Sequence, residues 1–362
     1  MSVSCGIVGL PNAGKSTIFN ALTSSKALVA DYPFTTIDPN IGIVNVPDER
    51  LMRLAEIIKP QRVIPSTLKI IDIAGLVEGA CKGEGLGNRF LANIREVDAI
   101  IHVVRCFESD LPHVYGKVDP KRDIEIVNLE LILADLETVE RRKNRVEKVA
   151  KSGNKEAQVE YRFLDCLQEH LSRGSSARLF NPQGEGERMA FVELNLLTAK
   201  SVLYLANLSD TDKNENLVGV LEVISKKEDA ELISIFGKLE SELSEFTEDE
   251  AQGLLKEMGY SESGFKRLIR ASYKLLDLIT FYTTNGIELR AWSIRRGTKA
   301  PKAAGKIHSD IERGFIKAEV MSYDDLLRCG SDTRVKELGF LRIEGKDYEI
   351  QDGNMVYFRF KN

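Results

Sequence analysis

The sequence predicts an α/β domain with a mostly parallel sheet, a helical insertion, and a smaller C-terminal α+β domain. Three observations support this prediction. Strand and helix signals alternate in the first third, a long helical pattern then interrupts them, and a β-rich composition follows from about residue 278. The chain has 362 residues, which is long for one domain and indicates two or three.

The expected strands of the first domain are short apolar runs separated by loops or helices. Such runs are typical of strands that are buried on both faces of a parallel sheet. The first run leads into a glycine-rich loop and then into a helical pattern at residues 16–22. The runs are residues 5–9, 42–46, 68–73, 99–104, 201–206 and 230–235.

The helical insertion is predicted from apolar residues spaced three or four apart between residues 129 and 146, where Lys143 is the polar exception. A turn is expected at Ser152, Gly153 and Asn154, and helical spacing continues to residue 171. We interpret the segment as a helical hairpin that packs on itself. The expected boundaries are 1–120 with 200–277 for the α/β domain, 121–199 for the insertion, and 278–362 for the last domain.

The last part of the chain changes in character. A helix is expected over residues 254–278 with a break at 259–261. Residues 281–294 and 348–360 are rich in β-branched and aromatic side chains, and Asp352 with Gly353 predicts a turn in the second run.

The glycine-rich loop carries the main functional signal. Residues 9–16 read Gly-Leu-Pro-Asn-Ala-Gly-Lys-Ser and match the phosphate-binding pattern G-x-x-x-x-G-K-[ST] in its expected setting. Backbone N–H groups and the following helix N-terminus attract phosphate. Lys15 is expected to reach the β- and γ-phosphates, and the Ser16 hydroxyl to hold Mg²⁺. The pattern therefore predicts a nucleotide hydrolase.

Companion residues strengthen this prediction. Asp72 ends an apolar run and fits a carboxylate near the metal through water, and the N–H of Gly75 fits a γ-phosphate sensor. Thr35 and Thr36 lie in a loop where one threonine can complete the Mg²⁺ shell only while the γ-phosphate is present. The residues alone do not choose between the two threonines, and a plain turn after Pro33 is the alternative.

The base-recognition signal is mixed. Asn207-Leu208-Ser209-Asp210 follows an expected strand, where guanine-specific proteins carry Asn-Lys-x-Asp. Leu208 can cover a purine ring but supplies no charge, whereas an aspartate accepts hydrogen bonds from guanine. Leu76 follows Gly75, where many GTPases have a glutamine that orients the attacking water. Another group must position that water, or turnover must wait for a partner.

Composition bounds the remaining possibilities. Hydrophobic residues make up 43 % and the formal net charge is -5, so any basic surface must be local. The five cysteines are scattered without a C-x-x-C pair, which favours a reducing compartment over a zinc site or disulfide framework. The N-terminus does not have the pattern of a signal peptide. The sequence contains no run of about 18 apolar residues, so no membrane span is predicted. We expect a cytoplasmic protein.

Two local basic regions suit RNA phosphates, with ordinary solvated charge as the alternative. The first spans residues 141–151 and contains six basic residues and one acidic residue, Glu147. The second spans residues 286–306 and contains six basic residues and one acidic residue, Glu288. The cations are Arg141, Arg142, Lys143, Arg145, Lys148 and Lys151, then Arg290, Arg295, Arg296, Lys299, Lys302 and Lys306.

Together these features resemble the YchF / Obg-like ATPase family, over nearly the whole chain and with high specificity. The resemblance is carried by CGIVGLPN (5–12), YPFTTIDPN (32–40), DIAGLV (72–77), KGEGLGN (82–88), HVVRCFE (102–108) and KDYEIQDG (346–353). It implies an OBG-type G domain, a helical coiled-coil insertion and a C-terminal TGS domain of β-grasp shape. It also implies ATP preference, weak intrinsic hydrolysis and association with the ribosome.

The resemblance also implies site residues. The nucleotide would contact residues 12–17, with Leu208 and its neighbour Asn207, and Mg²⁺ would be held by Ser16 and Thr36. The contacting loop residues are Asn12, Ala13, Gly14, Lys15, Ser16 and Thr17. The family usually ends its base motif in glutamate where this chain has Asp210, which loosens the expected ATP selectivity. A mobile-loop histidine replaces the missing glutamine in the family, and it matches His113, for which a plain surface histidine is the alternative reading.

Our leading hypothesis is a monomeric, ribosome-binding, Mg²⁺-dependent ATPase that contacts ribosomal RNA, has no membrane partner, and regulates translation. The second is a GTP-specific switch protein, which rests on Asn207 and Asp210. The third is an RNA- or protein-binding module whose nucleotide site is regulatory and barely hydrolytic.

Overall fold

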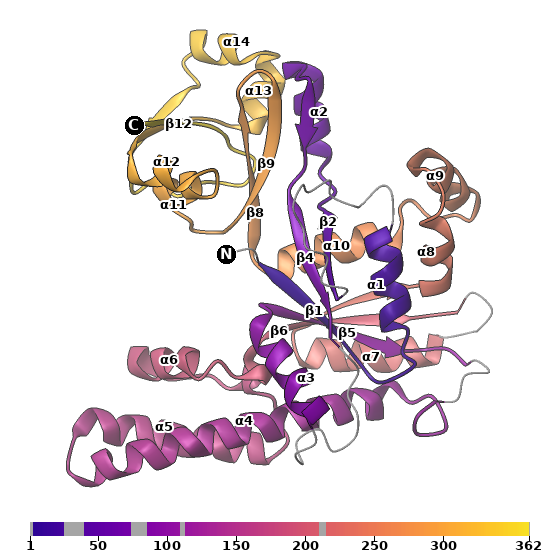
Figure 1. The fold of residues 1–362 in the computed structure, drawn as a ribbon, viewed down its shortest axis with the longest axis vertical. Helices are drawn as coiled ribbons and strands as arrows, with labels where there is room; N and C mark the ends of the chain where they lie inside the picture. The colour runs from indigo at the N-terminus through magenta and orange to yellow at the C-terminus, as the bar shows by residue number, and fades with distance from the viewer. Residues whose placement is uncertain (1–2, 25–39, 74–84, 109–112, 210–214, 362) are drawn as a thin grey trace. The chain divides into compact units, whose positions relative to one another are not determined.

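The computed structural model describes residues 3–24, 40–73, 85–108, 113–209 and 215–361. These residues form two compact units (Figure 1). The first unit contains the described residues up to 42 together with those of 69–268, and the second contains residues 43–68 and 269–361. No helix in the described ranges is long and apolar enough to cross a membrane.

The first sheet has six strands in the order β2-β4-β1-β5-β6-β7. The pairs β4–β1, β1–β5, β5–β6 and β6–β7 are all parallel, as the apolar runs predicted. All seven residues of β5 are buried, which explains its apolar sequence. The strands are β2 Ile41–Asn45, β4 Thr67–Asp72, β1 Ser4–Val8, β5 Ala99–Arg105, β6 Ser201–Asn207 and β7 Glu231–Ile235.

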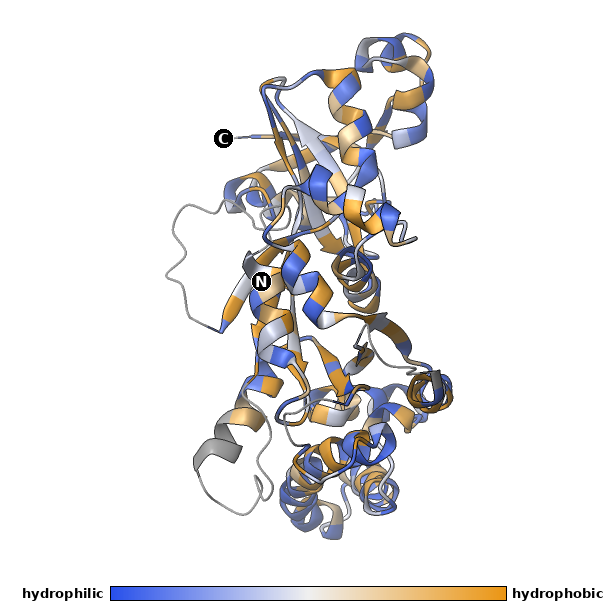
Figure 2. Cartoon of the chain, turned by 90° about the vertical axis from the view of Figure 1, so that its right-hand side faces the viewer, coloured by the Kyte–Doolittle hydropathy of each residue, from blue (hydrophilic) through white to orange (hydrophobic). Residues whose placement is uncertain are grey.

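Helices cover this sheet, and one shared core joins α3, α4 and α7 to β5 and β6. Figure 2 shows the strands of the first sheet mostly in orange and the helices with mixed blue and orange residues. The helix expected over residues 254–278 is interrupted as predicted, because α9 ends at Glu257 and α10 begins at Gly264. The helices of this part are α1 Lys15–Ser24, α3 Gly85–Glu96, α7 Glu215–Lys227, α8 Gly237–Leu243, α9 Glu248–Glu257 and α10 Gly264–Leu275.

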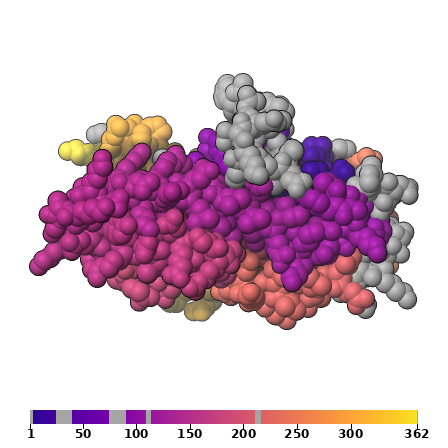
Figure 3. Space-filling model, turned by 90° about the horizontal axis from the view of Figure 1, so that it is seen from below, coloured from indigo at the N-terminus to yellow at the C-terminus, as the bar shows by residue number. Residues whose placement is uncertain are grey.

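The insertion contains the predicted helix, turn and helix as α4 Pro120–Lys151 and α5 Lys155–Ser172, followed by α6 Gly184–Glu193. Asp119 caps the first helix, and Pro120 stands at its start, where a missing N–H costs nothing. Figure 3 shows α4 and α5 side by side as a magenta mass. Lys143, the polar exception on the apolar face, pairs with Asp165 of α5 and donates to Gln168 Oε1 at 2.9 Å.

Buried hydrogen bonds tie the insertion to the strand that follows it. The Asp135 carboxylate of α4 is 1 % exposed and accepts from the backbone N–H groups of Leu197 and Thr198 at 2.7 and 2.8 Å. The Thr198 hydroxyl donates to the same carboxylate at 2.6 Å. These bonds fix the short 3-10 helix Leu197–Ala199 against α4 immediately before β6, so the chain returns to the sheet in one register.

The second unit has a mixed sheet in the order β11-β10-β12-β8-β9-β3. The β12–β8 and β3–β9 pairs are parallel, whereas β8–β9, β10–β12 and β10–β11 are antiparallel. Its strands are β11 Arg342–Glu344, β10 Phe315–Met321, β12 Met355–Phe360, β8 Leu278–Thr284, β9 Glu288–Arg295 and β3 Arg62–Ile64. Its helices are α2 Glu49–Ile58, α11 Ala300–Gly305, α12 Ser309–Arg313, α13 Tyr323–Cys329 and α14 Asp332–Glu337.

This second unit differs from the sequence expectation, which assigned residues 43–68 to the first domain. Leu51 and Leu54 of α2 are buried in a core with Tyr282 and Leu289, and β3 pairs with β9. Apolar burial and strand pairing therefore bring this early segment to the C-terminal sheet.

The run at residues 348–360 is a strand only in its second half, where β12 begins at Met355. The expected turn at Asp352 and Gly353 forms, with Gly353 at φ 84°. The Asp352 carboxylate accepts from Arg50 Nη1 at 2.8 Å and from the Thr280 N–H at 2.9 Å. These bonds hold the residues before β12 as a loop rather than a strand.

Candidate functional site

The phosphate-binding loop lies between the end of β1 at Val8 and the start of α1 at Lys15. Gly9 has a φ of 152°, and a Cβ there would lie 2.3 Å from the Val103 carbonyl oxygen. Gly14 has a φ of 94°, and a Cβ there would lie 2.2 Å from Asn207 Nδ2. The pattern glycines are thus required both by backbone conformation and by the close approach of β5 and β6.

Lys15 is buried in the first turn of α1, where 8 % of the residue is exposed. Its Nζ donates to the Leu10 carbonyl oxygen at 2.8 Å, so the ammonium folds back over the loop. Burial lowers the pKa of Lys15, and the charge of Asp72 partly opposes that shift. A cation that is desolvated in this way is strongly stabilised by a phosphate that reaches it.

Ser16 and Asp72 meet beside the loop, as their expected metal roles require. The Ser16 hydroxyl donates to Asp72 Oδ2 at 3.2 Å, and Asp72 ends β4. The other carboxylate oxygen, Asp72 Oδ1, is buried and has no hydrogen-bond partner among the residues that the structure describes. Mg²⁺ prefers oxygen ligands, and a buried carboxylate oxygen without a partner can bind the ion or one of its waters. The Ser16 and Asp72 side chains therefore fit a hydrated Mg²⁺.

Asn207 has a role that the sequence did not predict. Its side chain is buried, with Nδ2 donating to the Ala13 carbonyl at 3.0 Å and Oδ1 accepting from the Gly237 N–H at 3.1 Å. The amide therefore ties the phosphate loop to the start of α8. Gly237 is a site residue that the sequence did not point to. Glycine is needed there because a Cβ would lie 2.6 Å from Asn207 Oδ1. An isolated Gly after an apolar strand is its only local signal.

Leu208 follows β6, where its backbone N–H donates to the Ile235 carbonyl at 2.8 Å. Its half-buried side chain packs against the core that includes Val104 and Ala206.

Asn12 and Thr17, which lie on either side of Lys15 in the chain, are exposed, and Asn12 has a φ of 62°. The loop, Asp72 and Asn207 are thus brought together, with Leu208 adjacent to Asn207 in the chain. Thr35, Thr36, Gly75, Leu76 and Asp210 lie outside the described residues.

His113 is buried, not at the surface. Its Nε2 lies 2.8 Å from Asp123 Oδ2, and the Tyr115 N–H donates to Nδ1 at 3.2 Å. Asp123 sits in the first turn of α4, and burial raises its pKa although His113 and Arg122 oppose the shift. The alternative of a plain surface histidine is therefore wrong, because the ring is held in a buried hydrogen-bonded pair.

The two basic regions are less uniform than their sequences indicate. In the first region Arg142 pairs with Glu160, Lys143 with Asp165, and Lys151 with Glu147. In the second region, three of the six cations pair with carboxylates. Those pairs are Arg296 with Asp277, Lys299 with Asp347, and Lys302 with Glu312. On α4, Arg141, Arg145 and Lys148 have no ion pair with a carboxylate among the residues that the structure describes.

Known proteins resemble this chain over its full length. It is 50 % identical over 366 residues to the Ribosome-binding ATPase YchF of Bacillus subtilis (strain 168), covering 99 % of this chain and 100 % of that protein. The Ribosome-binding ATPase YchF of Escherichia coli O157:H7 is 47 % identical, over 99 % of both chains. The solved structure of the Schizosaccharomyces pombe YchF GTPase has a TM-score of 0.89 and 36 % identity, covering 99 % of this chain and 98 % of that chain.

Two family models match separate parts of the chain. The model MMR_HSR1, described as 50S ribosome-binding GTPase, matches residues 4–156. The model YchF-GTPase_C, described as a protein of unknown function (DUF933), matches residues 278–361. The fold is accordingly of the P-loop GTPase type, with α/β architecture and mixed sheets. Some relatives are named ATPase and others GTPase, so the names do not decide between adenine and guanine. That choice has to be argued from the residues of the site.

Proposed function

Because this chain belongs to the YchF family, we propose that it is a ribosome-binding P-loop nucleotide hydrolase that converts ATP to ADP and phosphate with slow intrinsic turnover and regulates translation. The observation that carries the proposal is the loop from Gly9 to Ser16, with its buried Lys15 facing inward. The proposal includes a cytoplasmic monomer, a coiled-coil character for residues 121–199, and a TGS domain of β-grasp shape at 278–362.

In this proposal the loop binds the phosphates through its backbone N–H groups and Lys15, which neutralises charge that develops during transfer. Mg²⁺, held by Ser16 and Thr36 with Asp72 acting through water, would neutralise phosphate charge when it is bound. The Gly75 N–H senses the γ-phosphate. Asn207 keeps Ala13 and the loop in the binding conformation through its two hydrogen bonds.

We assign ATP as the substrate because the lysine of the guanine motif is Leu208. An aliphatic side chain covers either purine and does not favour guanine. The Asn207 amide donates once to Ala13 and accepts once from Gly237, so part of its hydrogen-bonding capacity is left and it favours neither purine. Asp210 is the remaining feature that favours guanine.

Calorimetric titration with ADP and GDP in the presence of Mg²⁺ tests this assignment. We expect ADP to bind more tightly in the wild type, and we expect Leu208→Lys to raise GDP affinity relative to ADP by about tenfold, since one charge-assisted contact contributes about 1.5 kcal/mol. Asp210→Glu is the companion variant, and it should shift the preference toward ADP. A clear GDP preference in the wild type would sink the ATP assignment.

For hydrolysis we assign His113 to orient the attacking water, because Leu76 cannot. His113 must then leave Asp123, and the described pair is the resting arrangement of that residue. Neutral imidazole is a competent hydrogen-bond partner for water.

We expect His113→Ala to lower the single-turnover rate by about a hundredfold while ADP affinity changes less than about twofold. The matched variant Asp123→Ala breaks the same pair but retains the histidine, so it should reduce stability and keep turnover near the wild-type rate. Equal losses of turnover in both variants would assign His113 a structural role only, and unchanged turnover in His113→Ala would exclude catalysis by it.

Ribosome association, including contact with ribosomal RNA, is supported by the unpaired cations of α4. Co-sedimentation of the full chain with ribosomes, with and without ATP, measures it. Absence of the chain from the ribosomal pellet under both conditions would remove this part of the proposal.

A further inference from the structure

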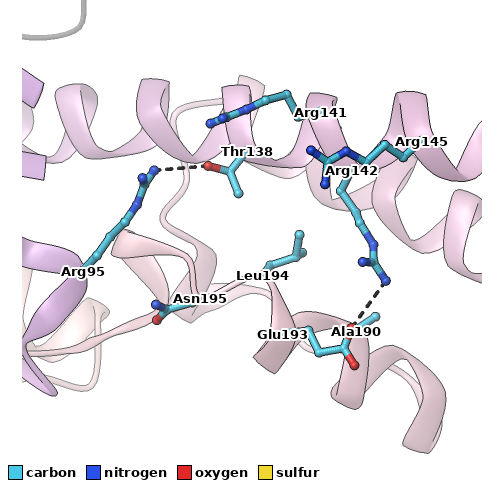
Figure 4. A pocket seen from close by; sticks show the side chains of 9 residues that line it. All are labelled: Arg95, Thr138, Arg141, Arg142, Arg145, Ala190, Glu193, Leu194 and Asn195. Carbon is cyan, nitrogen blue, oxygen red and sulfur yellow. Dashed lines mark hydrogen bonds and ion pairs between the residues drawn. The ribbon is translucent and has the colours of Figure 1, made fainter. Parts of the chain in front are cut away.

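A cavity of about 360 Å³ lies in the first unit on the side of α4 that faces α6 (Figure 4). Four arginines line it, and they come from two different helices. Arg95 belongs to the last turn of α3, whereas Arg141, Arg142 and Arg145 follow one another along α4. The chain thus brings together basic residues that lie about fifty positions apart.

The far wall is built from the end of α6 and the residues after it. Asn195 there has a φ of 44°, a left-handed conformation that turns the chain back toward the buried Leu196 and Leu197. Figure 4 shows Glu193 reaching toward Arg142 across this wall.

Arg142 is the neutralised member of the set. Its Nε lies 2.6 Å from Glu160 Oε1, and its Nη2 lies 3.4 Å from Glu193 Oε2. This arginine therefore has the role of an internal brace between α4, α5 and α6, and it does not contribute free charge to the cavity.

The other three arginines have no carboxylate within ion-pair distance among the described residues, although the charge of Arg95 acts on the buried Asp135 carboxylate. Arg95 Nη2 donates to the Thr138 hydroxyl at 3.4 Å, and Arg141 Nε donates to the Glu137 carbonyl of its own helix at 3.3 Å. Arg145 has neither a hydrogen bond nor an ion pair within the ranges that the structure describes. Elsewhere in the same unit Arg178 is paired at 2.8 Å with Glu228.

Three guanidinium groups without a close ion-pair partner around one cavity repel one another, and a bound anion relieves that repulsion. The guanidinium fork matches the oxygens of phosphate in a bidentate manner. Arg141 and Arg145 are one helical turn apart, roughly 6 Å along the axis, so they can contact successive anionic groups. Exposed Lys148 extends the same charge along α4.

We propose that this arginine cavity binds phosphate groups, with Arg95, Arg141 and Arg145 as the contacting residues and an RNA backbone as the source. The choice of RNA rests on the ribosome association proposed above, and on a row of cations longer than a single phosphate needs. A free oligophosphate has the same chemistry and is distinguished by the test. Thr138 and Asn195 add uncharged polar groups to the cavity wall.

The test compares the full chain with the double variant Arg141→Gln/Arg145→Gln. The matched control is Arg162→Gln/Arg188→Gln, which removes two exposed arginines of the same unit that do not line the cavity. Arg162 donates through Nε to the Gln158 carbonyl at 3.3 Å, as Arg141 does to Glu137, so each double variant removes one similar hydrogen bond within a helix. Saturating ADP and Mg²⁺ occupy the phosphate loop throughout, which keeps that site from binding the probes.

Two probes are titrated over a series of salt concentrations: a labelled single-stranded oligouridylate and inorganic tripolyphosphate. For the RNA we expect the cavity variant to weaken binding about tenfold and to reduce the slope of log affinity against log salt by about 1.4, the value for removal of two phosphate contacts on a single strand. The control variant should retain the wild-type slope.

A reduced RNA slope confined to the cavity variant supports the proposal with RNA as the source. Loss of tripolyphosphate binding with an unchanged RNA slope supports the phosphate site and replaces RNA with a free oligophosphate. Identical behaviour of the cavity and control variants with both probes overturns it. Ribosome co-sedimentation is measured separately. If the wild type does not sediment with ribosomes, the proposed function fails and the phosphate-binding result for the cavity still stands. If the wild type sediments normally but the cavity variant behaves like the control, only this inference fails.

Discussion

Lys15→Met is expected to reduce single-turnover ATP hydrolysis by about a thousandfold, the loss that follows removal of one preorganised charge from a phosphoryl-transfer site. Lys15 is buried, and among the described residues its ammonium donates to the Leu10 carbonyl and feels the charge of Asp72, so an approaching phosphate adds strong compensation. Methionine retains the apolar stem, so the loop should keep its packing.

The same substitution should leave the nucleotide-free protein as stable as the wild type or slightly more stable, because a desolvated charge is removed. Urea unfolding and phosphate release measure the two effects separately. Lys200→Met is the matched control: its Nζ donates to the Val97 carbonyl at 2.6 Å and to the Arg95 carbonyl at 3.1 Å, and burial lowers its pKa as well. Lys200→Met should hydrolyse ATP at the wild-type rate, and hydrolysis that persists in Lys15→Met would contradict the assigned role.

Gly14→Ala is expected to weaken ADP binding by about a hundredfold, which corresponds to about 3 kcal/mol of strain and displacement. The new Cβ would lie 2.2 Å from Asn207 Nδ2 in a backbone with φ 94°, so the amide that holds the Ala13 carbonyl must move. Calorimetric titration with ADP and Mg²⁺ measures the loss.

Gly153 provides the control for backbone strain alone. Its φ is 93°, and a Cβ there would have no atom within 4 Å. Gly153→Ala should cost about 1 kcal/mol of unfolding free energy and leave ADP affinity unchanged. Wild-type ADP affinity in Gly14→Ala would show that the contact with Asn207 does not position the loop.

The parts of the fold that sequence predicted are those encoded locally. The phosphate loop needs glycines at fixed spacing between a strand and a helix, and α4 and α5 need apolar residues at helical spacing, so both patterns lie within one segment. The turn at Gly153 is likewise local. By contrast, β3 has only three residues, two of them exposed, and nothing in its sequence indicates that it pairs with β9 more than two hundred positions later.

The candidate site follows the same division. Lys15, Ser16 and Asp72 could be assigned because their chemistry is carried by residue type and position after a strand. Asn207 was read as a base-recognition residue, but its amide is used between Ala13 and Gly237. The basic region of α4 could not be divided into braced and unpaired arginines, since the partners Glu160 and Glu193 come from other helices.

Helix α4 connects two hydrophobic cores, so a movement at one of its ends can be transmitted to the other. Its first half packs with the sheet through Ile124, Val127 and Leu131, while Val139 and Val146 pack in the core of the insertion. Asp123, the partner of His113, lies in its first turn, and the Asp135 bonds act as a fulcrum. From Asp135 to Lys151 the helix spans roughly 24 Å, so a tilt of about 10° at the fulcrum displaces the far end by about 4 Å. If His113 acts as proposed, its release from Asp123 would act on the short arm of this helix, and Arg141 and Arg145 lie on the long arm.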